Sequence, residues 1–156
     1  MSAAQLLDLA REKGAMLATA ESCTGGLIAA AITEVPGSSD IFDRGFVTYS
    51  NAAKTEMLGV EPALIETHGA VSEPVAAAMA TGARDHSTAT HAVSVTGVAG
   101  PGGSDLKPEG MVCFGIATPR SVATETVQFG PLGRSAVRQA TVAHALRLLV
   151  EALEGA

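Results

Sequence analysis

Aromatic residues are scarce in this chain of 156 residues. Phenylalanine, tyrosine and tryptophan together make up 3% of it, and tryptophan is absent. The hydrophobic content of 47% is still ample for a core, but that core has to consist of small side chains, which let helices pack closely against a sheet. The composition therefore favours an α/β fold, and the length favours a single domain over residues 1–156.

Cysteine is also rare, and histidine is sparse. Cys23 and Cys113 are too few for a disulfide framework and have no CxxC partner, so both are expected to be reduced. None of the four histidines has the spacing of a metal site. The sequence therefore predicts no metal and no cofactor.

Basic residues are outnumbered and dispersed. Ten Lys and Arg residues stand against sixteen Asp and Glu residues, which gives a net charge of −6. Nucleic-acid backbones require clustered basic residues, so direct binding to nucleic acid is not expected, although a nucleotide monomer is not excluded.

Long apolar runs are missing too. No run approaches the length of a membrane span, and residues 1–5 lack the basic start of a secretory signal. We therefore expect a cytoplasmic protein with no membrane partner.

Ser22 lies where a short apolar segment gives way to an Ala-rich one. Residues 15–20 suit a buried strand, and residues 27–34 continue as a helix. Ligands bind at the carboxyl edge of open α/β sheets, and the free N–H groups of a helix start favour negative charge there. Ser22 is therefore a candidate nucleophile, next to a site for a phosphate or an oxyanion.

Lys54 is the candidate base for Ser22. It follows the only tyrosine, Tyr49, which ends a predicted strand over residues 45–50, and Asn51 can cap the next helix. In the first helical turn a cation is unfavourable, which lowers the pKa of the lysine. Neutral Lys54 could then act as a general base with Tyr49 as a proton relay. A solvated surface lysine and a tyrosine that packs on the core would fit the same spacing.

Cys23 is the second candidate nucleophile, because a helix N-terminus lowers the pKa of a thiol. Successive residues point in different directions, so Cys23 and Ser22 cannot both face one substrate atom. No histidine lies near Cys23 in the sequence to pair with the thiol. Ser22 is therefore preferred.

A second glycine-rich segment covers residues 97–110, after a predicted strand over residues 91–96. It contains five glycines but no Gly-Lys-Ser/Thr ending, so it is neither a Walker A loop nor a dinucleotide fingerprint. Such a segment lets the backbone approach a ligand closely, or it serves as a flexible connector. Two further predicted strands, over residues 111–118 and 122–129, have only a short turn between them and should pair antiparallel. A final amphipathic helix is predicted over residues 134–153.

Four blocks of this sequence closely resemble the CinA C-terminal domain family, the bacterial nicotinamide-nucleotide amidohydrolases of the PncC type. The blocks are Ala20-Glu21-Ser22-Cys23-Thr24-Gly25-Gly26-Leu27, Gly45-Phe46-Val47-Thr48-Tyr49-Ser50-Asn51 with Lys54, His68-Gly69-Ala70-Val71-Ser72-Glu73, and Thr96-Gly97-Val98-Ala99-Gly100-Pro101-Gly102-Gly103 with Lys107-Pro108. They occur in the family's order and spacing, and the resemblance runs nearly end to end.

The resemblance implies both a fold and a reaction. The fold is a three-layer α/β/α sandwich around a mixed, mostly parallel sheet with an antiparallel hairpin near the C-terminus. The reaction hydrolyses the carboxamide of nicotinamide mononucleotide to nicotinate mononucleotide and ammonia, as part of pyridine nucleotide recycling. Ser22 corresponds to the nucleophile, Lys54 to the base and Tyr49 to its partner, and no metal is implied. Some members carry a larger domain ahead of this one, so this sequence looks like the stand-alone form.

Further residues are candidates for holding the mononucleotide. N–H groups around Thr24, Gly25 and Gly26 are expected to bind the oxyanion. The remaining substrate-binding candidates are Glu21, Arg44, Asn51, Ser72, Glu73, Thr96, Gly97, Gly100, Gly102 and Gly103. Asp105 and Glu109 depart from the family pattern in the second loop.

Two other functions stay open at this point. The chain could be a catalytically silent nucleotide-binding module, or a competence- or damage-inducible partner protein. Whether it forms a homo-oligomer is also left open.

Overall fold

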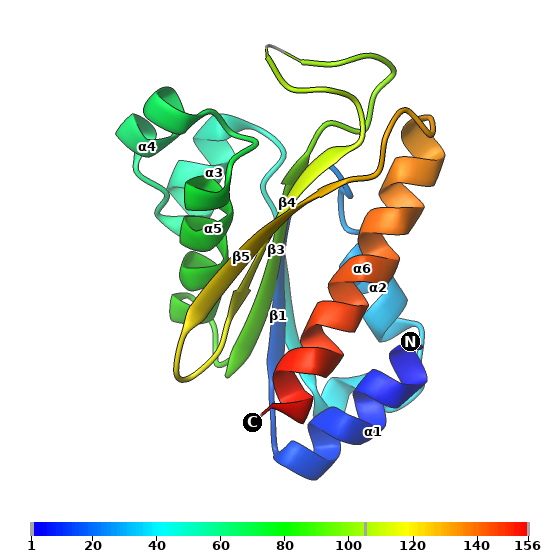
Figure 1. Ribbon diagram of the computed structural model, residues 1–156. Coiled ribbons are helices and arrows are strands. Elements are labelled where there is room, and N and C mark those ends of the chain that lie inside the picture. The colour runs from blue at the N-terminus through cyan, green and yellow to red at the C-terminus, as the bar shows by residue number, and fades with distance from the viewer. Residues whose placement is uncertain (1, 105, 156) are drawn as a thin grey trace.

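The computed structural model describes residues 2–104 and 106–155 as three layers, with helices on both faces of a central sheet (Figure 1). The strands are β1 (Leu17–Glu21), β2 (Phe42–Val47), β3 (His91–Gly97), β4 (Met111–Ala117) and β5 (Val122–Gln128). Their order in the sheet is β2-β1-β3-β4-β5. The expected α/β/α sandwich is thus confirmed.

The sheet is mixed. β1 pairs in parallel with β2 and β3, whereas β4 pairs antiparallel with both β3 and β5. Within the described residues β4 is therefore the one strand that runs against the others. The predicted hairpin near the C-terminus is β4–β5.

In residues 2–104 and 106–155, three α-helices cover each face of the sheet. On one face lie α1 (Ala3–Lys13), α2 (Leu27–Thr33) and α6 (Arg134–Glu154); on the other lie α3 (Asn51–Leu58), α4 (Pro62–His68) and α5 (Glu73–Asp85). A short 3-10 helix, η1 (Ser38–Asp40), leads into β2. In the part of the chain that is described, no helix is both long and apolar enough to cross a bilayer.

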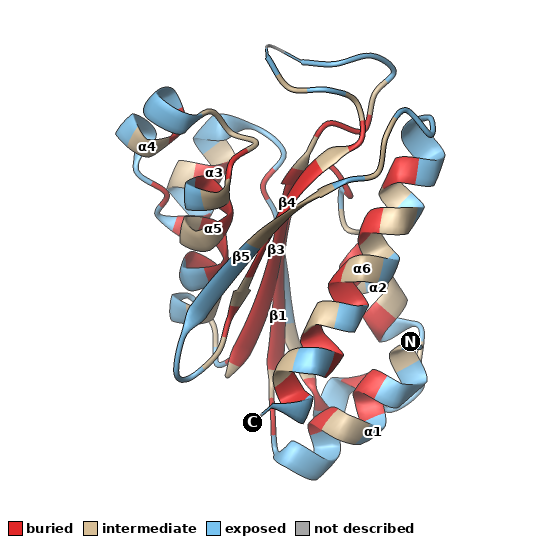
Figure 2. Cartoon of the chain, viewed as in Figure 1, coloured by how far each residue is buried: buried red, intermediate tan, exposed pale blue. Residues whose placement is uncertain are grey.

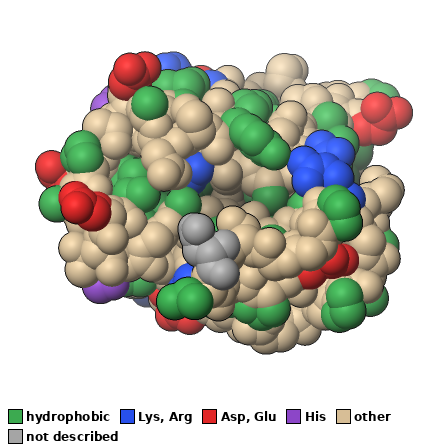
Figure 3. Space-filling model, turned by 90° about the horizontal axis from the view of Figure 1, so that it is seen from above, with side chains coloured by type: hydrophobic (Ala, Val, Ile, Leu, Met, Phe, Trp, Pro, Cys, Tyr) green, Lys and Arg blue, Asp and Glu red, His purple; other side chains and the backbone are tan. Residues whose placement is uncertain are grey.

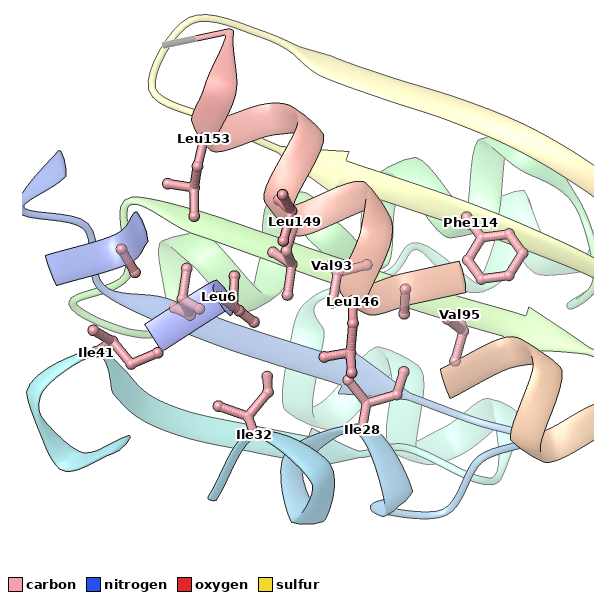
Figure 4. Close-up of a cluster of buried hydrophobic side chains, with 14 of the residues drawn as sticks. Leu6, Ile28, Ile32, Ile41, Val93, Val95, Phe114, Leu146, Leu149 and Leu153 are labelled. Carbon is pink, nitrogen blue, oxygen red and sulfur yellow. The ribbon is translucent and has the colours of Figure 1, made fainter. Parts of the chain in front are cut away.

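Each face of the sheet has its own apolar core, as the buried stripes in Figure 2 show. On the α1–α2–α6 side, aliphatic side chains such as Leu6, Ile28 and Leu149 meet Val93 and Val95 of β3, with Phe114 at one end (Figure 4). On the other side, the cluster around α5 is built largely from alanine and valine. Small side chains thus allow the close approach of helices and sheet that the composition predicted.

The predicted boundaries needed two corrections near Tyr49. The second strand covers Phe42–Val47 and not residues 45–50, because its partner β1 turns away after Glu21, which pairs with Val47. The cap of α3 is Ser50 and not Asn51, since the Ser50 side chain accepts a hydrogen bond from the amide of Ala53. Tyr49 therefore lies in the loop between β2 and α3.

The carboxyl ends of three parallel strands meet at one edge of the sheet. β1 leads there into the turn with Ser22, β2 into the loop before α3, and β3 into the glycine-rich loop that stands above the sheet in Figure 1. This convergence places residues from distant parts of the sequence in one region.

Candidate active site

Ser22 and Lys54 form a buried hydrogen-bonded pair at the edge of the sheet where β1, β2 and β3 end. Lys54 Nζ lies 3.0 Å from Ser22 Oγ, and only 8% of Ser22 and 1% of Lys54 are exposed. The interpretation of Lys54 as a solvated surface lysine is therefore wrong. The fourth residue of α3 points its amine back into the protein, toward the turn that follows β1.

The surroundings of Lys54 suit a neutral amine. Its Nζ also lies 2.9 Å from the carbonyl oxygen of Thr48 and 3.4 Å from that of Tyr49. A neutral amine has two N–H groups and one lone pair. The N–H groups can donate hydrogen bonds to these two carbonyls, and the lone pair can accept the hydroxyl proton of Ser22. Burial lowers the pKa of Lys54, and the nearby Cys23 opposes this to a smaller extent.

A cavity of about 220 Å³ opens beside the pair. It is lined by Ser22, Cys23, Tyr49, Asn51, Lys54, Ala70, Val71, Thr96, Gly97, Ala99 and Arg134. Figure 3 looks down on this edge, where acidic side chains lie mostly toward the rim and basic ones are seen both at the rim and nearer the middle. Arg134 is one of the residues that line the cavity, so an overall acidic protein places a cation there.

Tyr49 lies at the cavity with 63% of its surface exposed. Its hydroxyl accepts a hydrogen bond from Arg134 Nη2 at 3.1 Å, while only its backbone carbonyl bonds to Lys54. Arg134 also donates from Nη1 to the carbonyl of Gly100 at 2.8 Å. The geometry thus gives the tyrosine hydroxyl a partner other than the predicted one.

Arg134 was predicted from the sequence only as the start of the last helix, and not as a residue of the site. It is the first residue of α6 and lies 85 positions from Tyr49. The signal that could have found it is a basic residue directly after the Gly130–Gly133 break, at the start of a long helix.

Glu21 does not face the cavity, which corrects its assignment as a substrate-binding residue. Its carboxylate is buried and accepts hydrogen bonds from the Thr24 hydroxyl and from the amides of Gly26, Ile28 and Ala29. The carboxylate therefore satisfies the free N–H groups of α2 that a substrate anion would otherwise bind.

The oxyanion donors must also be reassigned. The amide of Gly26 is taken by Glu21, and that of Gly25 donates to the carbonyl of Ser22 at 3.1 Å. Among the described residues, no hydrogen bond to another residue is recorded for the amides of Cys23 and Thr24, and that of Cys23 contacts its own thiol. These two N–H groups, directly after the candidate nucleophile, are the ones left for an oxyanion, although Cys23 lines the cavity and Thr24 does not.

Cys23 is not an activated thiol. Its side chain belongs to the apolar core beneath the turn, and only 6% of the residue is exposed. Burial raises the pKa of the thiol to about 11. The expectation that the helix start lowers this pKa was wrong, because loss of hydration outweighs the helix dipole and Glu21 already occupies that helix start.

Three predicted substrate contacts lie elsewhere. Arg44 pairs with Asp43 and donates to the carbonyl of His86, far from the carboxyl edge. Ser72 donates to the carbonyl of Gly69, and the carboxylate of Glu73 accepts from two threonine hydroxyls of β5. Their polar groups bond to other parts of the protein, and none of the three is among the residues that line the cavity.

The remaining candidates divide into two groups. Asn51, Thr96 and Gly97 line the cavity. Gly100, Gly102 and Gly103 belong to the glycine-rich loop, where the amide of Gly102 donates to Glu109. A Cβ at Gly100 would lie 2.5 Å from the Glu109 side chain, which would have to shift.

Glu109 also accepts from the amide of Gly133 at 3.0 Å. This departure from the family pattern thus fastens the loop to the start of α6. The other departure, Asp105, lies outside the described residues. In the same described part of the chain, no group of three or more His, Cys, Asp or Glu side chains is arranged to hold a metal ion.

Comparison with known proteins gives consistent results. The family model for the CinA C-terminal domain matches residues 1–153. A CinA-like protein of Mycolicibacterium paratuberculosis is 54% identical over 87% of this chain, but the chain spans only 32% of that relative, and about a third of several others. The nicotinamide-nucleotide amidohydrolase PncC of Escherichia coli K12 is 49% identical over 89% of this chain and 85% of its own length.

Solved structures agree with these matches. The competence/damage-inducible protein CihA of Agrobacterium tumefaciens superposes with a TM-score of 0.93 at 48% identity, over 97% of this chain and 93% of its own. A CinA superfamily protein of Klebsiella pneumoniae 700603 gives 0.92 at 34% identity, with both chains fully covered. The chain described here belongs to the CinA C-terminal domain family.

Proposed function

We propose that this chain hydrolyses the carboxamide of nicotinamide mononucleotide, giving nicotinate mononucleotide and ammonia. The observation that carries the proposal is the buried Ser22–Lys54 pair, with its lysine deprived of solvent and facing a cavity. The likeness to the nicotinamide-nucleotide amidohydrolase PncC supports the choice of substrate.

The first half of the reaction forms an acyl-enzyme. Ser22 Oγ attacks the carboxamide carbon while Lys54 Nζ accepts the hydroxyl proton, and the carbonyl oxygen becomes an oxyanion. The amides of Cys23 and Thr24, directly after Ser22 in the chain, are the donors we assign to its stabilisation. Lys54 then returns the proton to the amide nitrogen, the C–N bond breaks, and ammonia leaves.

The second half repeats the sequence with water. Lys54, neutral again, takes a proton from a water molecule that attacks the ester carbon. The collapse of the second tetrahedral intermediate breaks the bond to Ser22 Oγ, which recovers the proton from Lys54. The products are the free acid and the original Ser22–Lys54 pair.

The cavity can hold only part of the substrate. Its volume of about 220 Å³ is below the roughly 300–1,000 Å³ of typical ligand sites, which suits the pyridine ring and its carboxamide. The ribose and phosphate would extend to the mouth, where the Tyr49 ring and the Arg134 guanidinium lie. A guanidinium is a suitable donor to phosphate oxygens.

We also propose a cytoplasmic location. Both cysteines are unpaired and buried, which fits a reducing compartment.

An ammonia assay tests the proposed function. Ammonia release is expected with nicotinamide mononucleotide and to be far slower with free nicotinamide, because the free base lacks the ribose and phosphate contacts that orient the amide. Calorimetric binding of the mononucleotide without ammonia release would identify a silent binding module instead.

A further inference from the structure

We propose that Arg138 is a positioning residue for the oxyanion site, a role that rests on the proposed function. Arg138 lies on α6, more than a hundred positions after Ser22, yet its guanidinium reaches the turn that Ser22 begins. Nε donates to the carbonyl of Cys23 and Nη2 to that of Thr24, each at 3.2 Å.

Most backbone amides in the turn that follows β1 donate to an identified acceptor. The amide of Ser22 donates to Val95, that of Gly25 to Ser22, and that of Leu27 to Thr24. Glu21 accepts from the next amides along the chain, those of Gly26, Ile28 and Ala29. Among the described residues, the amides of Cys23 and Thr24 have no recorded bond to another residue, and that of Cys23 contacts only its own thiol. Because buried amides are normally paired, we expect a ligand oxygen at these two donors.

Arg138 controls the direction of one of these two donors. In a planar trans peptide the carbonyl and the N–H point to opposite sides. Holding the Cys23 carbonyl on the α6 side therefore turns the Thr24 N–H the other way. The bond from the Gly25 amide to the Ser22 carbonyl fixes the Cys23 N–H by the same rule.

The positive charge of Arg138 also strengthens the Thr24 N–H as a hydrogen-bond donor. A cation at the carbonyl end polarises the peptide group, which makes its N–H a stronger donor. The approach is close: a side chain at Gly25 would meet Arg138 Nη2 at 3.4 Å, and Gly25 has a φ of +57°, a conformation that favours glycine. The turn is thus shaped to receive this guanidinium, which we place behind the oxyanion site and outside contact with the substrate.

Two variants and one control test the proposal. Arg138→Ala removes the guanidinium, and Arg138→Lys keeps a charge without the two-pronged geometry. Arg147→Ala is the matched control, because Arg147 lies on the same helix and bonds to His144. For each protein, kcat and KM for nicotinamide mononucleotide, the Tm, and recovery by guanidinium ion are measured.

The expected result is a selective loss of kcat. Arg138→Ala should lose about 10- to 100-fold in kcat with little change in KM, because only transition-state stabilisation suffers. Guanidinium ion should restore part of this loss. The kcat of Arg138→Lys should fall between those of Arg138→Ala and the wild type, and the kcat of Arg147→Ala should match the wild type. A kcat within twofold of the wild type, or a loss that follows the Tm and does not respond to guanidinium, would overturn the proposal.

A substrate-free measurement separates this inference from the proposed function. The amide NMR resonances of Cys23 and Thr24 should move in Arg138→Ala, return with guanidinium, and stay in place in Arg147→Ala. Unmoved resonances would refute the positioning role whatever the substrate is. Wild-type protein that releases no ammonia would instead refute the proposed function.

Discussion

At the residue scale, burial and local hydrogen bonding have opposite effects on the pKa of Lys54. Loss of hydration lowers the pKa of the amine, while carbonyl acceptors such as that of Thr48 would also hold an ammonium. Burial dominates, so the lysine is poised to lose its proton nearer to neutral pH than an exposed lysine. The same lowered pKa would serve the proposed base in catalysis and would make stability depend on pH.

Replacement of Lys54 by arginine tests the base directly. Arginine keeps the positive charge but has no accessible neutral form, so turnover is expected to fall by about 100-fold or more. In the wild type, kcat/KM should rise with pH through one apparent pKa below that of a free lysine. Near-native turnover of Lys54→Arg would mean that the residue only attracts the anionic substrate.

The stability of Lys54→Met relative to the wild type should depend on pH. The folded pKa of Lys54 is lowered, so below it the wild type bears the full cost of a buried charge, and that cost fades as pH rises toward the unfolded value of 10.5. Urea unfolding between pH 7 and 10.5 should show the advantage of Lys54→Met in unfolding free energy shrinking as the pH rises. A difference in unfolding free energy that does not change with pH would show that the charge of Lys54 does not destabilise the folded state.

Cys23 should be chemically silent. Its thiol has a pKa of about 11 and lies in the core, so Cys23→Ala is expected to retain most of the activity while losing about 1 kcal/mol of stability to the small cavity. Turnover and urea unfolding of the variant check both parts. Loss of turnover in Cys23→Ala with retention in Ser22→Ala would assign the nucleophile to the thiol.

At the scale of elements, the β1–α2 junction carries both the proposed nucleophile, Ser22, and the buried carboxylate of Glu21. The Glu21 carboxylate closes the amino end of α2 from within. Glu21→Gln places an amide where only acceptors fit, and it should lower the free energy of unfolding by about 2 kcal/mol. Chemical denaturation measures this, with Glu34→Gln, at the exposed far end of the same helix, as the control. Equal stabilities of the two variants would contradict the capping role.

The elements were largely predictable, and the side-chain directions within them were only partly so. Ser22 and Lys54 could be brought together from the sequence because each follows a strand that ends at the same sheet edge. The inward orientation of the Glu21 side chain could not be predicted, because the free N–H groups at a helix start can be bound either by a substrate or by a carboxylate of the chain itself. The bonds that Arg134 and Arg138 make to distant loops leave no periodic signal either.

At the scale of the whole molecule, the site depends on both layers of helices. Lys54 comes from α3 on one face of the sheet, while Arg134 and Arg138 come from α6 on the other (Figure 1). The sheet edge between them carries Ser22. This arrangement explains why the fold class alone could not identify the arginines, and why the activity is expected to require the complete sandwich.

Ammonia release from nicotinamide mononucleotide, measured in EDTA, tests the central claim most directly. If Lys54 is the base and backbone amides are the oxyanion donors, as proposed, the wild type and Cys23→Ala are expected to release ammonia, and Ser22→Ala to release none while remaining folded. Undiminished release by Ser22→Ala, or a wild type that is inactive in EDTA and restored by a divalent ion, would contradict the account.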